Sequence, residues 1–270
     1  MTTRLRPLLA PVVRLLVLLL VAVLALQLYF VARIALMAVI APESTAFERS
    51  EIYRVTRTSG SLKWRQQWVP SAQISVNLQR AVIASEDASF TEHDGLDLEA
   101  LEKAWEKNSV AEARAKKAAD RLAAQAARQG KKVSAPAAQL TAKAAKPAKI
   151  IGGSTITQQL AKNLFLSGER TLLRKGEELV LTLLLESMLS KQRILEIYLN
   201  SVEWGEGVFG AEAASQHYFR KPASRLSPYE AARLAVMLPR PRYFETRPNS
   251  DYLATRANVI VARMGGVEVP

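Results

Sequence analysis

The sequence predicts a mainly α fold that begins with one transmembrane helix. Residues 15–32 form an uncharged run of eighteen residues near the N-terminus. After residue 150, apolar residues recur at helical spacing, and Ser, Thr or Ser-Pro pairs stand where helices would begin. The β-branched and aromatic pattern typical of strands is confined to a short stretch before residue 70. The part outside the membrane is therefore expected to be mostly helical.

Residues 15–40 are predicted to form the transmembrane helix, and residues 1–14 a short cytoplasmic tail. Eighteen helical residues at about 1.5 Å each nearly cross a hydrocarbon layer of ~30 Å. The apolar residues on either side of this run supply the remaining length, and Arg14 and Arg33 can extend toward the head groups. The arginines of the tail favour a cytoplasmic N-terminus. A cleavable signal peptide is the competing interpretation, although its apolar core usually has only about 7–15 residues.

The net charge of +12 is concentrated in two places. Residues 109–149 hold ten Lys or Arg against two acids, a net of +8, and the first fourteen residues add +3. The rest of the chain carries about +1, so we expect no nucleic-acid partner. The chain has no cysteine and only two histidines. Disulfides, thiolate metal sites and histidine-rich metal sites are thereby excluded.

Before residue 106 the sequence predicts a short strand or hairpin followed by two helices. The strand or hairpin is expected within residues 52–70, because β-branched and aromatic residues flank a Ser59-Gly60 turn signal. Residues 76–85 have helical apolar spacing, which places Glu86 near the end of a helix. Residues 97–105 are expected to form the next helix, with Asp97 as its N-cap.

Residues 109–149 are predicted to be an exposed, mobile, basic insertion. Ala, Lys and Arg make up 26 of its 41 residues. Four large apolar side chains cannot bury enough surface to offset the entropy of ordering the segment. Residues 110–128 have high helix propensity, but an isolated helix of that length is marginal in water. Anionic lipid head groups should attract such a segment.

The remainder is predicted to consist of helices joined by turns. Thr155 or Ser154 is expected to cap the first of them. The later helices are predicted at residues 172–189, 191–199, 211–218, 228–238 and 252–264, with turns at 204–210 and a loop at 238–244. For the large aromatic residues we adopt core packing over sugar stacking; they are Trp64, Trp68, Trp105, Trp204 and Tyr198.

Glu86 is the first candidate catalytic residue. A lone carboxylate at a helix end is ordinarily solvated. When apolar groups partly surround it, its pKa rises, and it can accept a proton near neutral pH.

Glu178 is the second candidate acid. It lies three residues from Lys175 and four from Arg174 on an otherwise apolar helix, so all three share one face. Alone, this arrangement is an ordinary surface ion pair. Lys162 and Arg170 add cations nearby, and phosphoryl oxygens are bound by such cationic clusters. Lys191 and Arg193 are predicted on the exposed face of the next helix, where charges matter little.

Four motifs occur in a specific order: EDASFTEHDG, GGSTITQQLAKN, ERTLLRKGEE, and KQRILEIYLN followed by EWGEGVFGAEAA. With them the chain resembles glycosyltransferase family 51, and within it the monofunctional biosynthetic peptidoglycan transglycosylases. The resemblance covers the anchor and nearly all of residues 45–264, within a catalytic domain placed at residues 45–270. The one clear departure is the insertion. The resemblance implies a lysozyme-like α-helical head carrying Glu86 and a smaller, membrane-proximal jaw subdomain carrying Glu178.

The resemblance also implies an activity, the polymerisation of lipid II. The growing lipid-linked glycan chain is the donor, and the reaction inverts the anomeric centre and releases undecaprenyl pyrophosphate. Glu86 is then the general base, Glu178 positions substrate or cations, and preplaced cations stabilise the leaving pyrophosphate. Hydroxyl and amide groups suit sugar and phosphate oxygens. The implied substrate-binding residues are Asp87, Phe90, His93, Ser154, Thr155, Gln158, Gln159, Lys162, Asn163, Arg170, Arg174 and Lys175.

The sequence requires no cofactor, although Mg²⁺ or Mn²⁺ could assist the pyrophosphate, and no metal ligands are assigned. We expect no transpeptidase activity, because no Ser-x-x-Lys or Lys-Thr-Gly occurs. The expected location is the bacterial cytoplasmic (inner) membrane, with the catalytic domain on the periplasmic side. Cell-wall synthesis or division proteins are the candidate protein partners.

Two alternative functions remain. A lysozyme-like hydrolase or lytic transglycosylase would use Glu86 as an acid and would not need Lys162 or Arg170. A membrane-tethered scaffold would tolerate Glu86→Gln.

Overall fold

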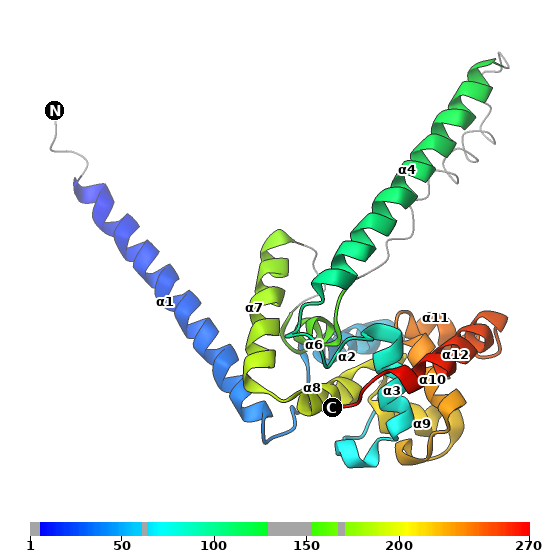
Figure 1. Cartoon of the computed structure of the whole chain (residues 1–270). Coiled ribbons are helices and arrows are strands. Elements are labelled where there is room, and N and C mark those ends of the chain that lie inside the picture. The colour runs from blue at the N-terminus through cyan, green and yellow to red at the C-terminus, as the bar shows by residue number, and fades with distance from the viewer. Residues whose placement is uncertain (1–5, 61–63, 129–152, 167–170) are drawn as a thin grey trace. The chain divides into compact units, whose positions relative to one another are not determined.

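The computed structural model describes residues 6–60, 64–128, 153–166 and 171–270 of the chain. Its contacts define two compact units. The first comprises Met1–Gly95 and Thr155–Pro270, and the second comprises Leu96–Ser154. Figure 1 follows both along the chain. Arg170 and residues 129–149 of the predicted insertion lie outside the described residues.

The N-terminal helix α1 spans Arg6–Met37. Among the described residues, Ala10–Met37 is the one helical segment long and apolar enough to cross a membrane, with a mean hydropathy of 2.8. Most of α1 is exposed, but Phe30, Ile34 and Met37 are buried in the core of the first unit. Removing α1 as a signal peptide would empty these core positions. The packing therefore favours a retained anchor.

Helix α2, Ala46–Ser59, occupies the first part of the stretch in which a short strand or hairpin was predicted. The Thr45 hydroxyl accepts a hydrogen bond from the Glu48 N–H at 3.0 Å, and the Glu48 carboxylate accepts from the Thr45 N–H at 2.7 Å. This reciprocal capping box begins the helix. Gly60, with a φ of 63°, ends it as a left-handed C-cap. The turn predicted at Ser59-Gly60 was wrong, because this signal marks the end of a helix.

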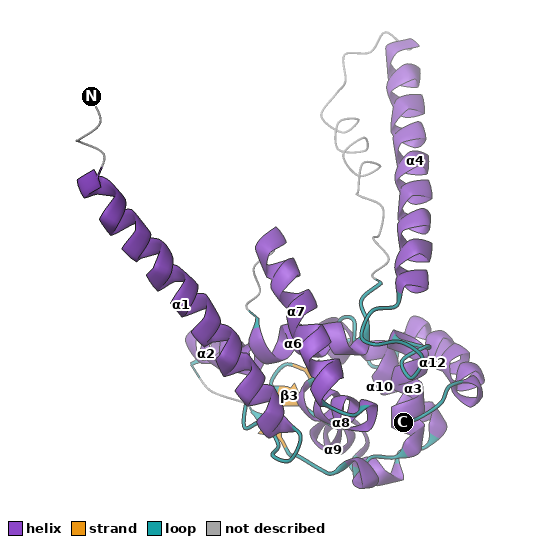
Figure 2. Ribbon diagram, turned by 60° about the vertical axis from the view of Figure 1, so that its left-hand side comes forward, coloured by secondary structure: helices purple, strands orange, loops and turns teal. Residues whose placement is uncertain are grey.

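A small three-stranded sheet joins distant parts of the first unit. Strand β1 (Arg65–Gln66) pairs in parallel with β3 (Val208–Phe209), and β3 pairs antiparallel with β2 (Glu203–Gly205). The strands are drawn in orange in Figure 2. The predicted short strand is therefore reduced to two residues, and the turn-rich segment at 204–210 contains a hairpin.

The remaining helices follow the predicted order closely. They are α3 Val76–Glu86, α6 Ile156–Phe165, α7 Leu172–Met188, α8 Lys191–Ser201, α9 Ala211–Phe219, α10 Pro228–Met237, α11 Pro241–Glu245 and α12 Asp251–Arg263, with short 3-10 turns at Ser71–Gln73, Ala223–Arg225 and Met264–Gly266. Helix α11 falls in the predicted loop. Helix α10 packs against α3 and α12, while α6 packs against α2, α7 and α8. Tyr198 and Trp204 are fully buried, as core packing predicts.

The second unit is built on α4, Leu98–Arg128. The Asp97 carboxylate accepts the Ala100 N–H at 2.7 Å, which confirms the predicted cap. The helix does not end at Trp105 but continues through the first half of the basic segment. Once nucleated, a helix extends easily through Ala-rich sequence. Trp105 is 75% exposed, so its predicted core packing is wrong; it lies on an exposed face of α4.

Candidate active site

Glu86 is the last residue of α3 and is half-buried. Burial raises the pKa of its carboxyl group, and the negative charge of Asp87 adds to the rise. Hydrogen bonds from Gln159 and Ser85 oppose it. Among the described residues, no Lys or Arg forms an ion pair with Glu86. A carboxylate in this setting is suited to accepting a proton near neutral pH.

Two further side chains hold Glu86 in place. The Gln159 amide Nε2 donates to Glu86 Oε2 at 3.0 Å, and the Tyr198 hydroxyl donates to Gln159 Oε1 at 3.0 Å. Because Oε1 accepts from Tyr198, the amide must turn Nε2 toward Glu86. Burial raises the pKa of Tyr198 well above its usual value, so it remains a donor. Tyr198 was predicted only to pack in the core, because no local signal in the sequence connects it with Gln159.

The side chains of Asp87 and His93 bond to each other and to the backbone of two other segments. Asp87 Oδ1 lies 2.8 Å from His93 Nε2, and Asp87 Oδ2 accepts the Ile156 N–H at 2.9 Å. The Gly95 N–H donates to His93 Nδ1 at 3.1 Å, so Nε2 carries the proton of the neutral ring. Asp87 is buried. These contacts connect the end of α3 with the loop at His93 and Gly95 and with the start of α6.

Thr155 and Gln158 form a capping box at the start of α6. The Thr155 hydroxyl accepts the Gln158 N–H at 3.2 Å, and Gln158 Oε1 accepts the Thr155 N–H at 3.1 Å. The Thr155 hydroxyl also donates to the Gly95 carbonyl at 2.7 Å. Both residues were predicted to bind substrate. In the structure both side chains cap α6, and the Thr155 hydroxyl also fixes α6 against the loop that follows Glu86.

Gly95 allows this loop to approach α7. Its φ of 85° is one that side chains rarely adopt. An added Cβ would lie 2.7 Å from the Thr182 Cγ2 atom and 2.8 Å from the Glu186 Cγ atom. The glycine of the first motif is therefore required by both backbone conformation and packing.

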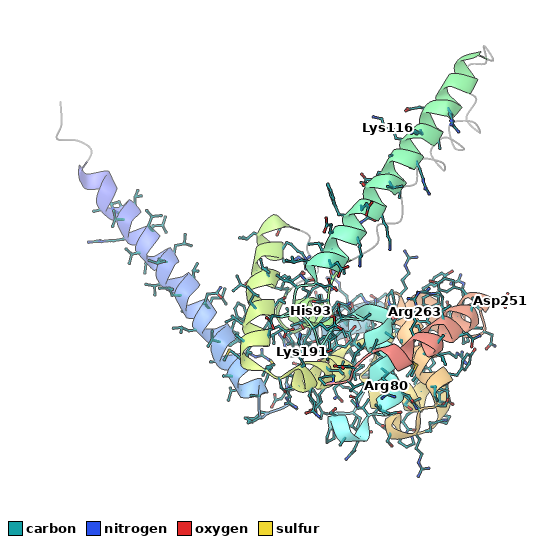
Figure 3. The ribbon with its side chains drawn as sticks, in the orientation of Figure 1. Arg80, His93, Lys116, Lys191, Asp251 and Arg263 are labelled. Atoms are coloured by element: carbon teal, nitrogen blue, oxygen red, sulfur yellow. The ribbon has the colours of Figure 1, made fainter. Side chains whose placement is uncertain are left out.

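Lys191 and Arg193 are not on an exposed face, contrary to prediction. Lys191 donates to the His93 carbonyl, and its ammonium group lies 4.6 Å from the centre of the buried Phe90 ring. Figure 3 labels Lys191 and His93. Arg193 Nε donates to the Met37 carbonyl at 2.7 Å. The start of α8 packs against the His93 loop and the end of α1, so both cations serve as internal contacts.

Glu178 lies on the buried face of α7 and is only 4% exposed. Lys175 forms an ion pair with it, and Arg174 Nη1 lies 3.9 Å from its Oε2. The predicted shared face is therefore confirmed. Arg174 Nε is buried and has no hydrogen-bond partner among the described residues. Helix α7 packs against α6, the helix that carries Gln159.

The other residues predicted to bind substrate differ in their exposure to solvent. Lys162 is exposed on α6, and Asn163 beside it is half-buried. Lys162 follows Gln159 by three residues, so the two share one side of the helix. Ser154 is exposed at the end of the second unit. The structure therefore brings Lys162 within one turn of the amide that holds Glu86.

Comparison with known proteins gives a consistent result. The family described as transglycosylase matches residues 53–144 and 129–265, and these two stretches overlap inside the Ala- and Lys-rich segment. A Burkholderia thailandensis protein named biosynthetic peptidoglycan transglycosylase is 51% identical over 247 residues, which cover 92% of this chain and 83% of that protein. Proteins of the same name from Burkholderia orbicola and Burkholderia pseudomallei are each 49% identical, covering 92% of this chain and 86% and 83% of theirs.

Proposed function

The chain belongs to the transglycosylase family, and from this premise we propose that it is a membrane-anchored peptidoglycan glycosyltransferase that polymerises lipid II. The observation that carries the proposal is the contrast between two acids. Glu86 is held by a neutral amide with its pKa raised by burial, while Glu178 pairs with cations on α7. Transfer of a sugar from a pyrophosphate requires two elements. A base accepts the proton of the attacking hydroxyl, and a cationic site binds the leaving pyrophosphate.

Glu86 acts as the general base in this proposal. The 4-hydroxyl of the acceptor GlcNAc loses its proton to the Glu86 carboxylate as its oxygen attacks the anomeric carbon of the donor. The bond from that carbon to the pyrophosphate breaks, and the leaving group takes the electron pair with inversion from α to β. A raised pKa makes Glu86 a stronger proton acceptor. The Gln159 amide keeps the carboxylate oriented.

The leaving pyrophosphate gains negative charge in the transition state. Preplaced cations act most strongly at that point. Lys162 and Arg170 are the residues proposed to meet this charge, and Glu178 orients Arg174 and Lys175. Glu178 forms ion pairs with Lys175 and Arg174. These protein cations stabilise the charge in this proposal, and a divalent ion could assist the pyrophosphate.

The anchor keeps the catalytic domain at the membrane surface. Phe30, Ile34 and Met37 pack into the core, so α1 and the domain form one structure. A lipid-linked donor and acceptor both lie at that surface. We infer that the N-terminus is cytoplasmic and that the catalytic domain faces the periplasm, across the inner membrane.

The test is to incubate purified full-length protein with lipid II. The proposal expects long glycan polymer that lysozyme can digest, together with release of undecaprenyl pyrophosphate. Absence of polymer would overturn it. Shortening of preformed glycan without polymer would favour a hydrolase or lytic transglycosylase.

Lys162→Gln separates the transferase from a hydrolase further. Loss of one charge-assisted contact to the leaving group should lower kcat at least tenfold. Arg256→Gln is the control, because Arg256 is an exposed cation on α12. Equal activity in the two variants would remove Lys162 from the reaction.

A further inference from the structure

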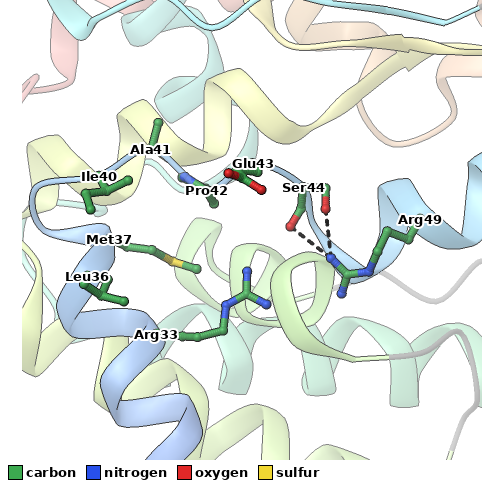
Figure 4. A pocket seen from close by; sticks show the side chains of 9 residues that line it. All are labelled: Arg33, Leu36, Met37, Ile40, Ala41, Pro42, Glu43, Ser44 and Arg49. Carbon is green, nitrogen blue, oxygen red and sulfur yellow. Dashed lines mark hydrogen bonds between the residues drawn. The ribbon is translucent and has the colours of Figure 1, made fainter.

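A pocket of about 370 Å³ lies where α1 ends and α2 begins. Figure 4 shows it from close by. Its lining comes from α1, the connecting loop and α2, and none of it comes from α3, α6 or α7. The lining therefore includes neither Glu86 nor Glu178, although the Arg33 guanidinium carbon lies 5.9 Å from the centre of the Phe165 ring at the end of α6. The lining residues that matter here are Arg33, Leu36, Ile40, Glu43, Ser44 and Arg49.

Two guanidinium groups point toward one another across this pocket in Figure 4. Arg33 Nη1 donates to the Tyr29 hydroxyl at 3.1 Å, and Arg49 Nη1 donates to the Ser44 carbonyl and hydroxyl at 3.1 and 3.0 Å. Within the described residues, neither arginine forms an ion pair with a carboxylate. A guanidinium has five N–H donors, so each can still donate to an anion. The two cations are held in place by neutral partners.

An exposed apolar surface adjoins these cations. Leu36 is 56% exposed, Val39 82% and Ile40 57%. The apolar span ends at Met37, so these residues lie at the level where lipid head groups meet the hydrocarbon layer. Glu43 is the single acid of the lining, which leaves the pocket with a formal charge of +1.

We propose that this pocket binds the phosphate of an anionic glycerophospholipid from the surrounding bilayer. Arginine pairs bind phosphate through bidentate hydrogen bonds, and the exposed leucine and isoleucine side chains would contact the glycerol and the first acyl carbons. The pyrophosphate of a lipid-linked sugar has the same phosphate chemistry. The bilayer lipid is favoured because the pocket contains no residue of the helices that carry the two acids. A lipid bound there would fix the depth at which the domain sits.

The experiment measures lipid binding to the detergent-solubilised full-length protein by native mass spectrometry. Phosphatidylglycerol is the probe, and phosphatidylcholine, inorganic phosphate and a polyprenyl pyrophosphate are the comparators. The test variant is Arg33→Gln with Arg49→Gln. The control is Arg57→Gln with Arg256→Gln, which removes the same charge. Arg57 is a matched residue, because it also donates Nη1 to a tyrosine hydroxyl four residues earlier, at 3.1 Å.

We expect the test variant to bind phosphatidylglycerol at least about tenfold more weakly than the native protein, and the control to bind it normally. Glu43→Gln should strengthen binding, because it removes the one negative charge of the lining. Thermal unfolding without lipid checks that all variants remain folded. Equal binding by the test and control variants would overturn the proposal, as would equally tight binding of phosphatidylcholine or inorganic phosphate. Tighter binding of the polyprenyl pyrophosphate through the same arginines would assign the pocket to substrate instead.

Discussion

Glu86 and Glu178 are the same residue type in opposite surroundings. Glu86 accepts hydrogen bonds from a neutral amide and a serine, and burial raises its pKa. Glu178 is more deeply buried, but Lys175 and Arg174 lie against it. Burial alone therefore does not make a carboxylate a base. What matters is whether the groups around the carboxylate stabilise its charge.

The two environments also arise differently. The partners of Glu178 precede it by three and four residues on one helix, so they follow from helical geometry. Gln159 is 73 residues from Glu86, and Tyr198 is 39 residues from Gln159. The surroundings of Glu86 therefore exist only in the folded chain. Substitutions at each acid should consequently have different effects.

The largest expected effect comes from Glu86→Gln. Loss of a general base should lower kcat for lipid II polymerisation by about 10²–10⁴. The exposed Glu92 on the following turn offers a matched control, and Glu92→Gln should retain activity. Initial rates of polymer formation measure both. Near-normal turnover in a folded Glu86→Gln variant would contradict the proposal, because Glu86 would then not be the base.

Glu86→Gln should also change the stability of the fold in a definite direction. The folded pKa of Glu86 lies above its unfolded value, so the folded state binds the proton more tightly and loses stability as pH rises through that pKa. Glutamine carries no charge to bury. Glu86→Gln should therefore unfold at the same or a higher temperature than the native protein at pH 7, with the difference disappearing below about pH 4. A lower unfolding temperature at pH 7 would contradict the raised pKa.

Glu178→Gln should have an intermediate effect of a different kind. It leaves two cations side by side, so both stability and turnover should fall. We expect a loss of about 2 kcal/mol in the free energy of unfolding, below the usual value for a fully buried pair because Lys175 is 55% exposed. Turnover should fall about tenfold or more. Urea unfolding and kcat measure the two effects.

The double variant Glu178→Met with Arg174→Met tests whether Glu178 acts in the reaction or only in packing. Replacing these two buried charges with apolar groups of similar size should recover much of the stability but none of the activity, because the remaining cation, Lys175, is 55% exposed. Recovery of activity as well would show that Glu178 is only a packing residue.

The smallest expected effect comes from Tyr198→Phe. Without the hydroxyl, Gln159 is free to turn, and its bond to Glu86 weakens. That bond lowers the pKa of Glu86, so the pKa should rise further and the acidic limb of kcat/KM should move to higher pH. A several-fold loss of kcat should accompany the shift.

Tyr218→Phe provides the control for this variant. The Tyr218 hydroxyl donates to the Trp204 carbonyl at 2.7 Å, and burial also raises its pKa. The substitution should lower stability without moving the acidic limb. If both variants leave the pH profile unchanged, Tyr198 has only a packing role.

Some errors of prediction came from local signals and others from tertiary contacts. The capping box of Thr45 and Glu48 is a local signal for a helix, whereas the β-branched residues that follow are typical of a strand. The exposed positions predicted for Lys191 and Arg193 failed for another reason. Their partners, the carbonyls of His93 and Met37, lie 98 and 156 residues away.

The sequence by itself determined the features that depend on neighbours within about one helical turn. These include the apolar length of α1, the caps at Asp97 and Thr155, and the pairing of Glu178 with Lys175, all of which follow from helix geometry. Tertiary structure alone decided which atoms surround Glu86, because burial and the Gln159 contact require α3, α6 and α8 to pack together. The pocket between Arg33 and Arg49 likewise exists only because the chain turns back after α1. Short-range geometry repeats with a fixed period, whereas the direction in which a packed side chain points depends on every element around it.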